Sequence, residues 1–269
     1  YDGTERGAVP GLAFGRLNAQ GVYSTTVTRP RLFADYLTEQ LTLLRESYDV
    51  TMSVEPSQQE IPFPYVLDGI SGPELGGITP LELARYFPTT ELADIGDEIA
   101  DGFLSFGNGA ERPLSLFDGL RTDYSLARLK HYTGSEVSDF QDFILFTNYH
   151  RYVDEFVNWG ATQIGQHGYV ALTGAAGLDI REPTAHAQDQ LNDTAWRRHQ
   201  MPAYHLIRED GRGITLVNIG VGPSNAKTIC DHLAVLRPHA WMMIGHCGGL
   251  RSTQKIGDFV LAHAYLRDD

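Results

Sequence analysis

The sequence predicts an α/β protein, with an N-terminal α+β domain at residues 1–137 and a second domain of α/β type at residues 138–269. In the second half, short apolar runs are followed by polar or glycine-rich turns and then by helical patterns, which is the order of an α/β sheet. The first half mixes strand-like pieces with helices and a stretch rich in proline and glycine. A chain of 269 residues is long enough for two domains.

In the first half, the pattern predicts a hairpin of Ala13–Leu17 and Gly21–Thr28, a helix from Pro30 to about Ser47, a strand at Thr51–Val54 and a helix over Ser125–Tyr132. Pro30 suits a first helical turn because its missing N–H would have no partner there. Ser125 is expected near the cap of the later helix, and Gly134 is expected to close it.

In the second half, the pattern predicts strands at Phe143–Phe146, Ile214–Ile219, Trp241–Ile244 and Asp258–Tyr265, and helices that begin near Arg151 and span Asn225–Leu236. The strand at Trp241–Ile244 is expected to be buried. Because neighbouring strand residues point to opposite faces, we expect one of Met242 and Met243 to lie in the core.

The composition is that of a folded globular protein, with 42% hydrophobic and 20% charged residues. A net charge of −13 excludes broad contact with nucleic acid but permits a small anionic ligand in a cleft that holds a few arginines. The cysteines Cys230 and Cys247 indicate a reduced, cytoplasmic protein, and the lack of a ligand-spaced His, Asp or Glu cluster predicts no metal. No apolar run approaches the roughly 18 residues of a membrane helix, so no membrane association is expected.

Two glycine loops are the candidate ligand-binding features. The first is GVGPSNA at Gly220–Ala226, and the second is GHCGGL at Gly245–Leu250. Glycine lets the backbone approach a ligand, and the helix that follows the first loop offers unpaired N–H groups to an anion. The alternative is that each loop is only a tight structural turn.

The order of these loops and strands resembles the nucleoside phosphorylase and nucleosidase superfamily. Within it, the chain is similar to the AMP nucleosidase family in STTVTRPRLF (Ser24–Phe33), RYFPTTELADIGDE (Arg85–Glu98), LFTNYHRYVDEF (Leu145–Phe156), ITLVNIGVGPSNAKTICDHLAVLRP (Ile214–Pro238) and IGHCGGLR (Ile244–Arg251). The resemblance runs over nearly the whole chain. It implies a regulatory-type N-terminal domain followed by part of a three-layer, phosphorylase-like α/β domain.

The resemblance implies hydrolysis of the N-glycosidic bond of AMP to adenine and ribose 5-phosphate. Related phosphorylases carry an arginine for nucleophilic phosphate at the position of Met243, so water is favoured as the nucleophile here. The family's catalytic acid and its ribose-binding Met-Glu pair are expected beyond Asp269, with the chain truncated inside the catalytic domain. The alternatives are a purine nucleoside phosphorylase or, if the chain is complete, a non-catalytic nucleotide- or phosphate-binding module.

The expected substrate-binding residues are Arg151, Gly222, Ser224, His246, Cys247 and Gly248. By resemblance, Arg151 lies where relatives place a phosphate-binding arginine, and His246 where a small residue touches ribose or phosphate. The alternatives are a solvated helix face for Arg151, a helix cap for Ser224 and a structural hydrogen bond for His246. Cys247 is expected to pack against the base and not to act as a nucleophile, because nothing nearby marks it for a lowered pKa.

In the N-terminal domain, Arg29 and Arg31 flank Pro30 at the predicted helix start and form a candidate allosteric anion site. The alternative is a pair of exposed arginines on an ordinary helix. The resemblance implies activation by MgATP, inhibition by phosphate, no cofactor in the active site and assembly as a homohexamer.

Overall fold

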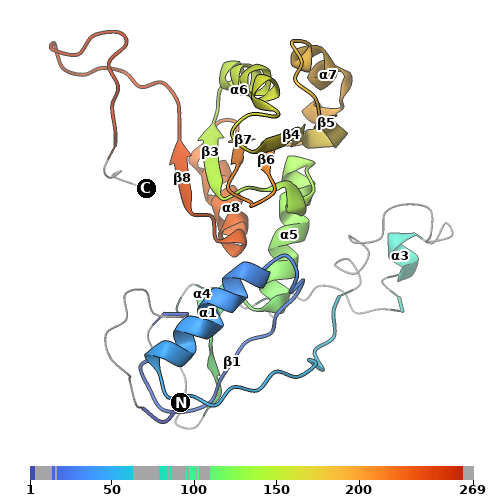
Figure 1. Cartoon of the computed structure of the whole chain (residues 1–269), viewed down its shortest axis with the longest axis vertical. Helices are drawn as coiled ribbons and strands as arrows, with labels where there is room; N and C mark the ends of the chain where they lie inside the picture. The colour runs from blue at the N-terminus through green and yellow to red at the C-terminus, as the bar shows by residue number, and fades with distance from the viewer. Residues whose placement is uncertain are drawn as a thin grey trace. The chain divides into compact units, whose positions relative to one another are not determined.

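The computed structural model describes residues 1–3, 14–15, 17–62, 79–83, 85–86, 95, 97–100, 102 and 110–262. The chain forms two compact units, described separately here (Figure 1). The first unit comprises Tyr1–Asp139 and Ala226–Arg237, and the second comprises Phe140–Asn225 and Pro238–Asp269. Residues 226–237, expected in the second domain, are thus counted with the first unit, and the division at residue 137 stays a prediction.

The described elements of the first unit are β1 (Tyr23–Ser24), α1 (Ala34–Ser47), α3 (Pro80–Leu83), α4 (Asp97–Ala100), β2 (Arg112–Pro113), α5 (Gly119–Thr133), η3 (Val137–Asp139), η6 (Ala234–Leu236) and most of α8 (Pro223–Leu233). The hairpin prediction is wrong for the described residues. β1 pairs in parallel with β2, Tyr23 opposite Arg112. Leu17 instead packs in a small core with Leu44 and Tyr48, and its N–H donates to the Tyr48 hydroxyl at 3.0 Å.

Helix α1 ends at Ser47 as predicted but begins at Ala34, because residues 30–33 form a turn in which the Leu32 N–H donates to the Arg29 carbonyl at 2.9 Å. The predicted strand at Thr51–Val54 is absent. These residues are exposed and form no helix or strand. An alternating pattern without a partner strand has no ladder hydrogen bonds to stabilise it.

Helix α5 begins earlier than predicted. Its N-cap is Asp118, whose carboxylate accepts the Arg121 N–H at 2.8 Å, so Ser125 is a buried residue inside the helix and not its cap. Gly134 closes the helix as predicted, with a left-handed φ of 68° that glycine adopts without steric cost.

The second unit is built on a six-stranded sheet of order β5-β4-β6-β7-β3-β8. The strands are β3 (Phe143–Thr147), β4 (Tyr169–Gly174), β5 (Leu178–Ile180), β6 (Ala203–Arg208), β7 (Ile214–Asn218) and β8 (Ala240–Met243); the helices are α6 (His150–Gln163), η4 (Ala175–Gly177), α7 (Ala187–Asp193) and η5 (Trp196–Arg198). β7, β3 and β8 are parallel, whereas β4, β5 and β6 join by antiparallel pairs. Figure 1 shows the arrows of β3 and β8 pointing the same way. The predicted mixed α/β class is confirmed.

The core of this unit lies between the sheet and α6. Apolar residues at helical spacing on α6, including Val153, Val157 and Ala161, pack in one cluster with Leu172 and Leu206 of the sheet. These side chains are at most 2% exposed. The predicted helix near Arg151 and the predicted strands at Phe143 and Ile214 are therefore confirmed.

β8 lies where a strand was predicted, but its predicted burial is wrong. All four residues of β8 are exposed, Met242 at 55% and Met243 at 44%, because β8 is the edge strand of the described sheet. Neither methionine lies in the core. The predicted strand at Asp258–Tyr265 is also wrong over its described residues 258–262, which form no ladder.

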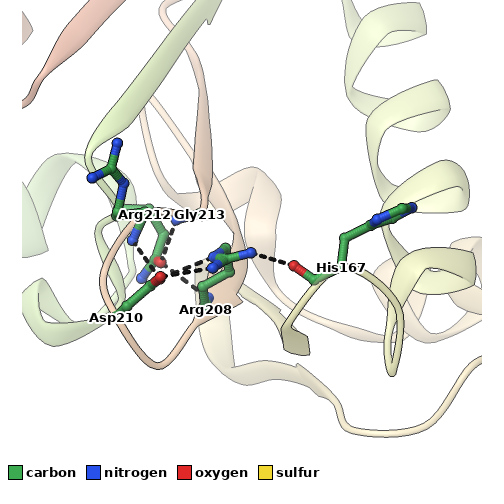
Figure 2. A network of polar contacts seen from close by, with 6 residues as sticks. His167, Arg208, Asp210, Arg212 and Gly213 are labelled. Carbon is green, nitrogen blue, oxygen red and sulfur yellow. Dashed lines mark hydrogen bonds and ion pairs between the residues drawn. The ribbon is translucent and has the colours of Figure 1, made fainter.

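The β6–β7 hairpin is held by charged and backbone contacts that Figure 2 shows. Arg208 binds both oxygens of Asp210, at 2.9 Å from Nε and 2.7 Å from Nη2. Asp210 Oδ1 also accepts the Arg212 N–H at 3.1 Å, and Arg208 donates to the His167 carbonyl. The side-chain hydrogen bond from Arg208 is the main reason that the pKa of Asp210 falls to about 2.

A buried histidine stands in the middle of the sheet. His205 of β6 lies opposite Thr173 and Thr215 on the neighbouring strands and is fully buried. Its Nδ1 is 2.9 Å from the Thr215 hydroxyl, while its Nε2 has no hydrogen-bond partner. Burial lowers the pKa of His205 to about 3, because a charged imidazolium would lose its hydration.

His205 should make stability depend on pH. Between pH 6.5 and 3 the unfolded chain binds a proton at this histidine and the folded chain does not, so stability falls as the pH falls through this window. Urea unfolding of His205→Gln should show a pH slope smaller by up to about 1.4 kcal/mol per pH unit between pH 6 and 4. The exposed-histidine variant His186→Gln is the control; equal slopes in both variants would contradict the prediction.

Candidate functional site

The candidate site lies at the edge of the sheet where the three parallel strands β7, β3 and β8 end. Ladder bonds run to the strand ends: the Ile219 N–H donates to the Thr147 carbonyl at 2.8 Å, and the Ile244 N–H to the Phe146 carbonyl at 2.8 Å. The loops that follow the three strands therefore leave the sheet side by side. Ligands of α/β proteins collect at such carboxyl edges.

The loop after β7 is the first glycine loop, and Asn218 shapes it. Asn218 is 5% exposed, and its side-chain oxygen accepts the Gly220 N–H at 3.1 Å. Gly220 and Gly222 have φ values of 62° and 116°, conformations that a residue with a Cβ rarely adopts. Asn225 then donates to the Ile219 carbonyl at 2.9 Å, which closes the turn at the start of α8.

The loop after β3 connects to this turn through His150. The Asn218 amide nitrogen lies 3.3 Å from His150 Nδ1, and since an amide NH₂ only donates, Nδ1 accepts. The His150 ring lies 5.4 Å from the Trp196 ring of η5. Asn148 has a buried side-chain oxygen without a partner in the described structure. The β3 and β7 loops thus share one polar network.

The loop after β8 packs on the loop after β3. His246 lies against two tyrosines, its ring centroid 4.8 Å from Tyr149 and 5.5 Å from Tyr152. Its Nε2 is 3.2 Å from the Tyr152 hydroxyl. A Cβ on Gly245 would stand 3.6 Å from the Tyr149 ring, so the backbone here approaches the β3 loop closely.

The structure places Arg151, Gly222, Ser224 and His246 at this edge, whereas no described contact places the exposed residues Cys247 and Gly248 there. Arg151 is the second residue of α6, Gly222 and Ser224 lie at the start of α8, and His246, Cys247 and Gly248 follow β8. Arg151 and Ser224 are exposed and form no hydrogen bond or ion pair with any described residue, so the expected alternative of a cap at Ser224 is not observed. Their roles in binding stay predictions.

Sequence reasoning missed the residues that arrange these groups, namely Asn218, Tyr149, His150 and Tyr152. The segment TNYHRY could have indicated them, because Tyr149 and Tyr152 are three residues apart and side chains at this spacing lie on the same face of a helix. What they touch depends on the pairing of β3 with β7 and β8, which no local pattern reveals.

The candidate anion site of Arg29 and Arg31 in the first unit does not lie at the helix start that the sequence predicts. Arg29 lies 3.4 Å from the largely buried carboxylate of Asp123, which also accepts from the Thr28 hydroxyl at 2.9 Å. Arg31 is exposed. Because α1 begins at Ala34, neither arginine lies at a helix start, and Arg29 is already paired with an acid.

Among the residues that the structure describes, no group of three or more His, Cys, Asp or Glu is placed to hold a metal ion. Cys230 and Cys247 are free thiols. No helix in the described ranges is long and apolar enough to cross a membrane.

The chain matches two family descriptions and two curated proteins. Residues 2–111 match "Bacterial AMP nucleoside phosphorylase N-terminus", and residues 169–269 match "Phosphorylase superfamily". AMP nucleosidase from Escherichia coli (strain K12) is 60% identical over 271 aligned residues, which include 100% of this chain. The chain is thus similar to AMP nucleosidases along its whole length and contains a segment of the phosphorylase superfamily.

The same 60% identity holds for AMP nucleosidase from Escherichia coli O157:H7. The chain spans 55% of the length of these curated relatives. The crystal structure of AMP nucleosidase from Bacteroides thetaiotaomicron VPI-5482 is 25% identical, with a TM-score of 0.33 over 48% of this chain and 41% of that one.

The Asn218 network can be tested by Asn218→Leu. The change leaves the Gly220 N–H without its acceptor in a partly buried turn, which should lower the free energy of unfolding by about 1 kcal/mol. Urea unfolding measures the loss, and amide exchange at Gly220 should accelerate. Asn158→Leu on the exposed face of α6 is the control. An Asn218→Leu protein as stable as this control would contradict the assigned role.

Proposed function

We propose that the protein hydrolyses the N-glycosidic bond of AMP, which yields adenine and ribose 5-phosphate. The observation that carries this proposal is the 60% identity to curated AMP nucleosidases along the entire chain. The sheet edge that carries the glycine loops and the exposed guanidinium of Arg151 supports it, because AMP is an anion with a flat base.

The phosphate of AMP is assigned to Arg151, Ser224 and His246. Arg151 is an exposed guanidinium without a partner in the described structure, and its planar fork suits phosphate oxygens. Both α6 and α8 begin at this edge, so their first N–H groups add to the positive field. The backbone at Gly222 and Gly248 carries no Cβ that would keep the nucleotide away, and Cys247 is assigned to the base.

Water is the proposed nucleophile. Met243 ends β8 at the position where related phosphorylases hold phosphate with an arginine, and a thioether donates no hydrogen bond to phosphate. Departure of adenine also needs an acid near N7 and groups that bind the ribose. We assign these to the part of the curated relatives that the chain does not cover.

Product analysis tests the reaction. Incubation with AMP in ¹⁸O-water should release adenine and place ¹⁸O on C1 of ribose 5-phosphate, whether or not inorganic phosphate is present. Ribose 1,5-bisphosphate formed in phosphate buffer would show a phosphorylase instead. Nucleotide binding without adenine release would favour a binding module.

Arg151→Ala tests the phosphate assignment. Loss of a charge-assisted hydrogen bond should raise KM for AMP roughly 10- to 100-fold while KM for adenosine changes little. Arg181→Ala is the matched control, because Arg181 is an exposed arginine of the same unit paired with Asp179. Equal KM values for AMP in the wild type and Arg151→Ala would contradict the assignment.

We also propose that MgATP activates and phosphate inhibits the enzyme, and that it assembles as a cytoplasmic homohexamer. The match of residues 2–111 to the family's N-terminal description supports a regulatory role of the first unit. Phosphate inhibition that persists unchanged in the Arg29→Ala, Arg31→Ala double variant would exclude these arginines as the anion site. Light scattering of the purified protein tests the hexamer.

A further inference from the structure

Two tyrosines of the β3–α6 junction surround the imidazole of His246. Tyr149 precedes α6 as its N-cap residue, and Tyr152 is in the first turn of the helix. Their rings lie 6.0 Å apart at an interplanar angle of 82°, so they present a face and an edge to the histidine. His246 meets Tyr149 edge-on at 73° and Tyr152 at 32°. These contacts fix the plane of an otherwise exposed side chain.

The hydrogen bond between Tyr152 and His246 is compatible with a ring that carries hydrogen on Nδ1. When the phenol O–H donates to Nε2 of a neutral imidazole, the proton of the ring resides on Nδ1. If the imidazole is charged, Nε2–H donates to the phenol oxygen and Nδ1 again carries hydrogen. In both of these arrangements Nδ1–H is a donor that the bond to Tyr152 leaves unused.

Nothing in the described structure uses this donor. His246 is exposed, and its one hydrogen-bonding contact with the described residues is the bond to Tyr152. Nδ1–H belongs to the loop that leaves β8 at the same sheet edge as Arg151 and the start of α8. An N–H donor at the same sheet edge as a guanidinium and two helix starts suits an oxyanion.

We propose that Tyr152 is a positioning residue, which holds His246 in the Nδ1–H form so that it donates to a phosphoryl oxygen of the bound nucleotide. This inference rests on the proposed function, because the phosphorylated ligand is the AMP of that proposal. Tyr152 itself does not touch the ligand; it acts through His246, and Tyr149 limits the rotation of the ring.

The spectroscopic test is Tyr152→Phe, which keeps the ring and removes only the hydroxyl. In the ¹⁵N spectrum of His246, assigned with the variant His246→Gln, the ligand-free wild type should show hydrogen on Nδ1, and Tyr152→Phe should shift the equilibrium towards hydrogen on Nε2. Tyr169→Phe, at the start of β4 opposite Arg208, is the matched control and should leave the His246 signals unchanged. An unchanged tautomer in Tyr152→Phe would overturn the inference.

The binding test uses inorganic phosphate as the probe. Tyr152→Phe should weaken phosphate binding roughly 2- to 10-fold, the effect of one ordinary hydrogen bond, and should have no further effect in a His246→Ala background. A full additional loss in that background would overturn the proposal, since Tyr152 would then act independently of His246. The two proposals fail separately: absence of adenine release counts against AMP hydrolysis alone, whereas an unaltered tautomer counts against Tyr152 alone.

Discussion

The parallel pairing of β7, β3 and β8 is the constraint on which the rest of the candidate site depends. Backbone hydrogen bonds continue to the pairs Ile219–Thr147 and Ile244–Phe146, so the three strands end at the same level of the sheet. A shift of one residue would turn the alternate side chains to the other face and separate the loops. Groups distant in the sequence, such as Tyr152 and His246, meet only because this register holds.

Helix α6 serves both the core and the site. Its buried stripe, with Val153 and Val157, packs on the sheet, while its first turn supplies Arg151 and Tyr152 at the edge. Rigid packing of the helix body is what makes the first turn a precise support for exposed residues. Asn218 has the matching function on β7, since one buried amide connects the glycine loop with His150.

The sequence allowed the strands β3 and β7 to be predicted, because apolar runs bounded by glycine turns are local signals. β8 was located correctly, but its burial was not, since the position of a strand at a sheet edge depends on the pairing of the whole sheet. The strands β4, β5 and β6 were missed. At Thr51–Val54 and over residues 258–262, alternation without a partner produced no strand. The glycine loops and Arg151 could be named from the sequence as candidates, and their binding roles stay predictions. The Tyr152–His246 bond depends on tertiary packing and could not be predicted.

We propose that the loops after β7, β3 and β8 form one nucleotide-binding edge. The most direct measurement is an NMR titration of ¹⁵N-labelled protein with AMP under conditions where turnover is slow. Amide shift changes should concentrate together in residues 148–152, 220–225 and 245–248, with one shared Kd. Changes confined to one of these loops, or found only in the first unit, would contradict a common binding edge.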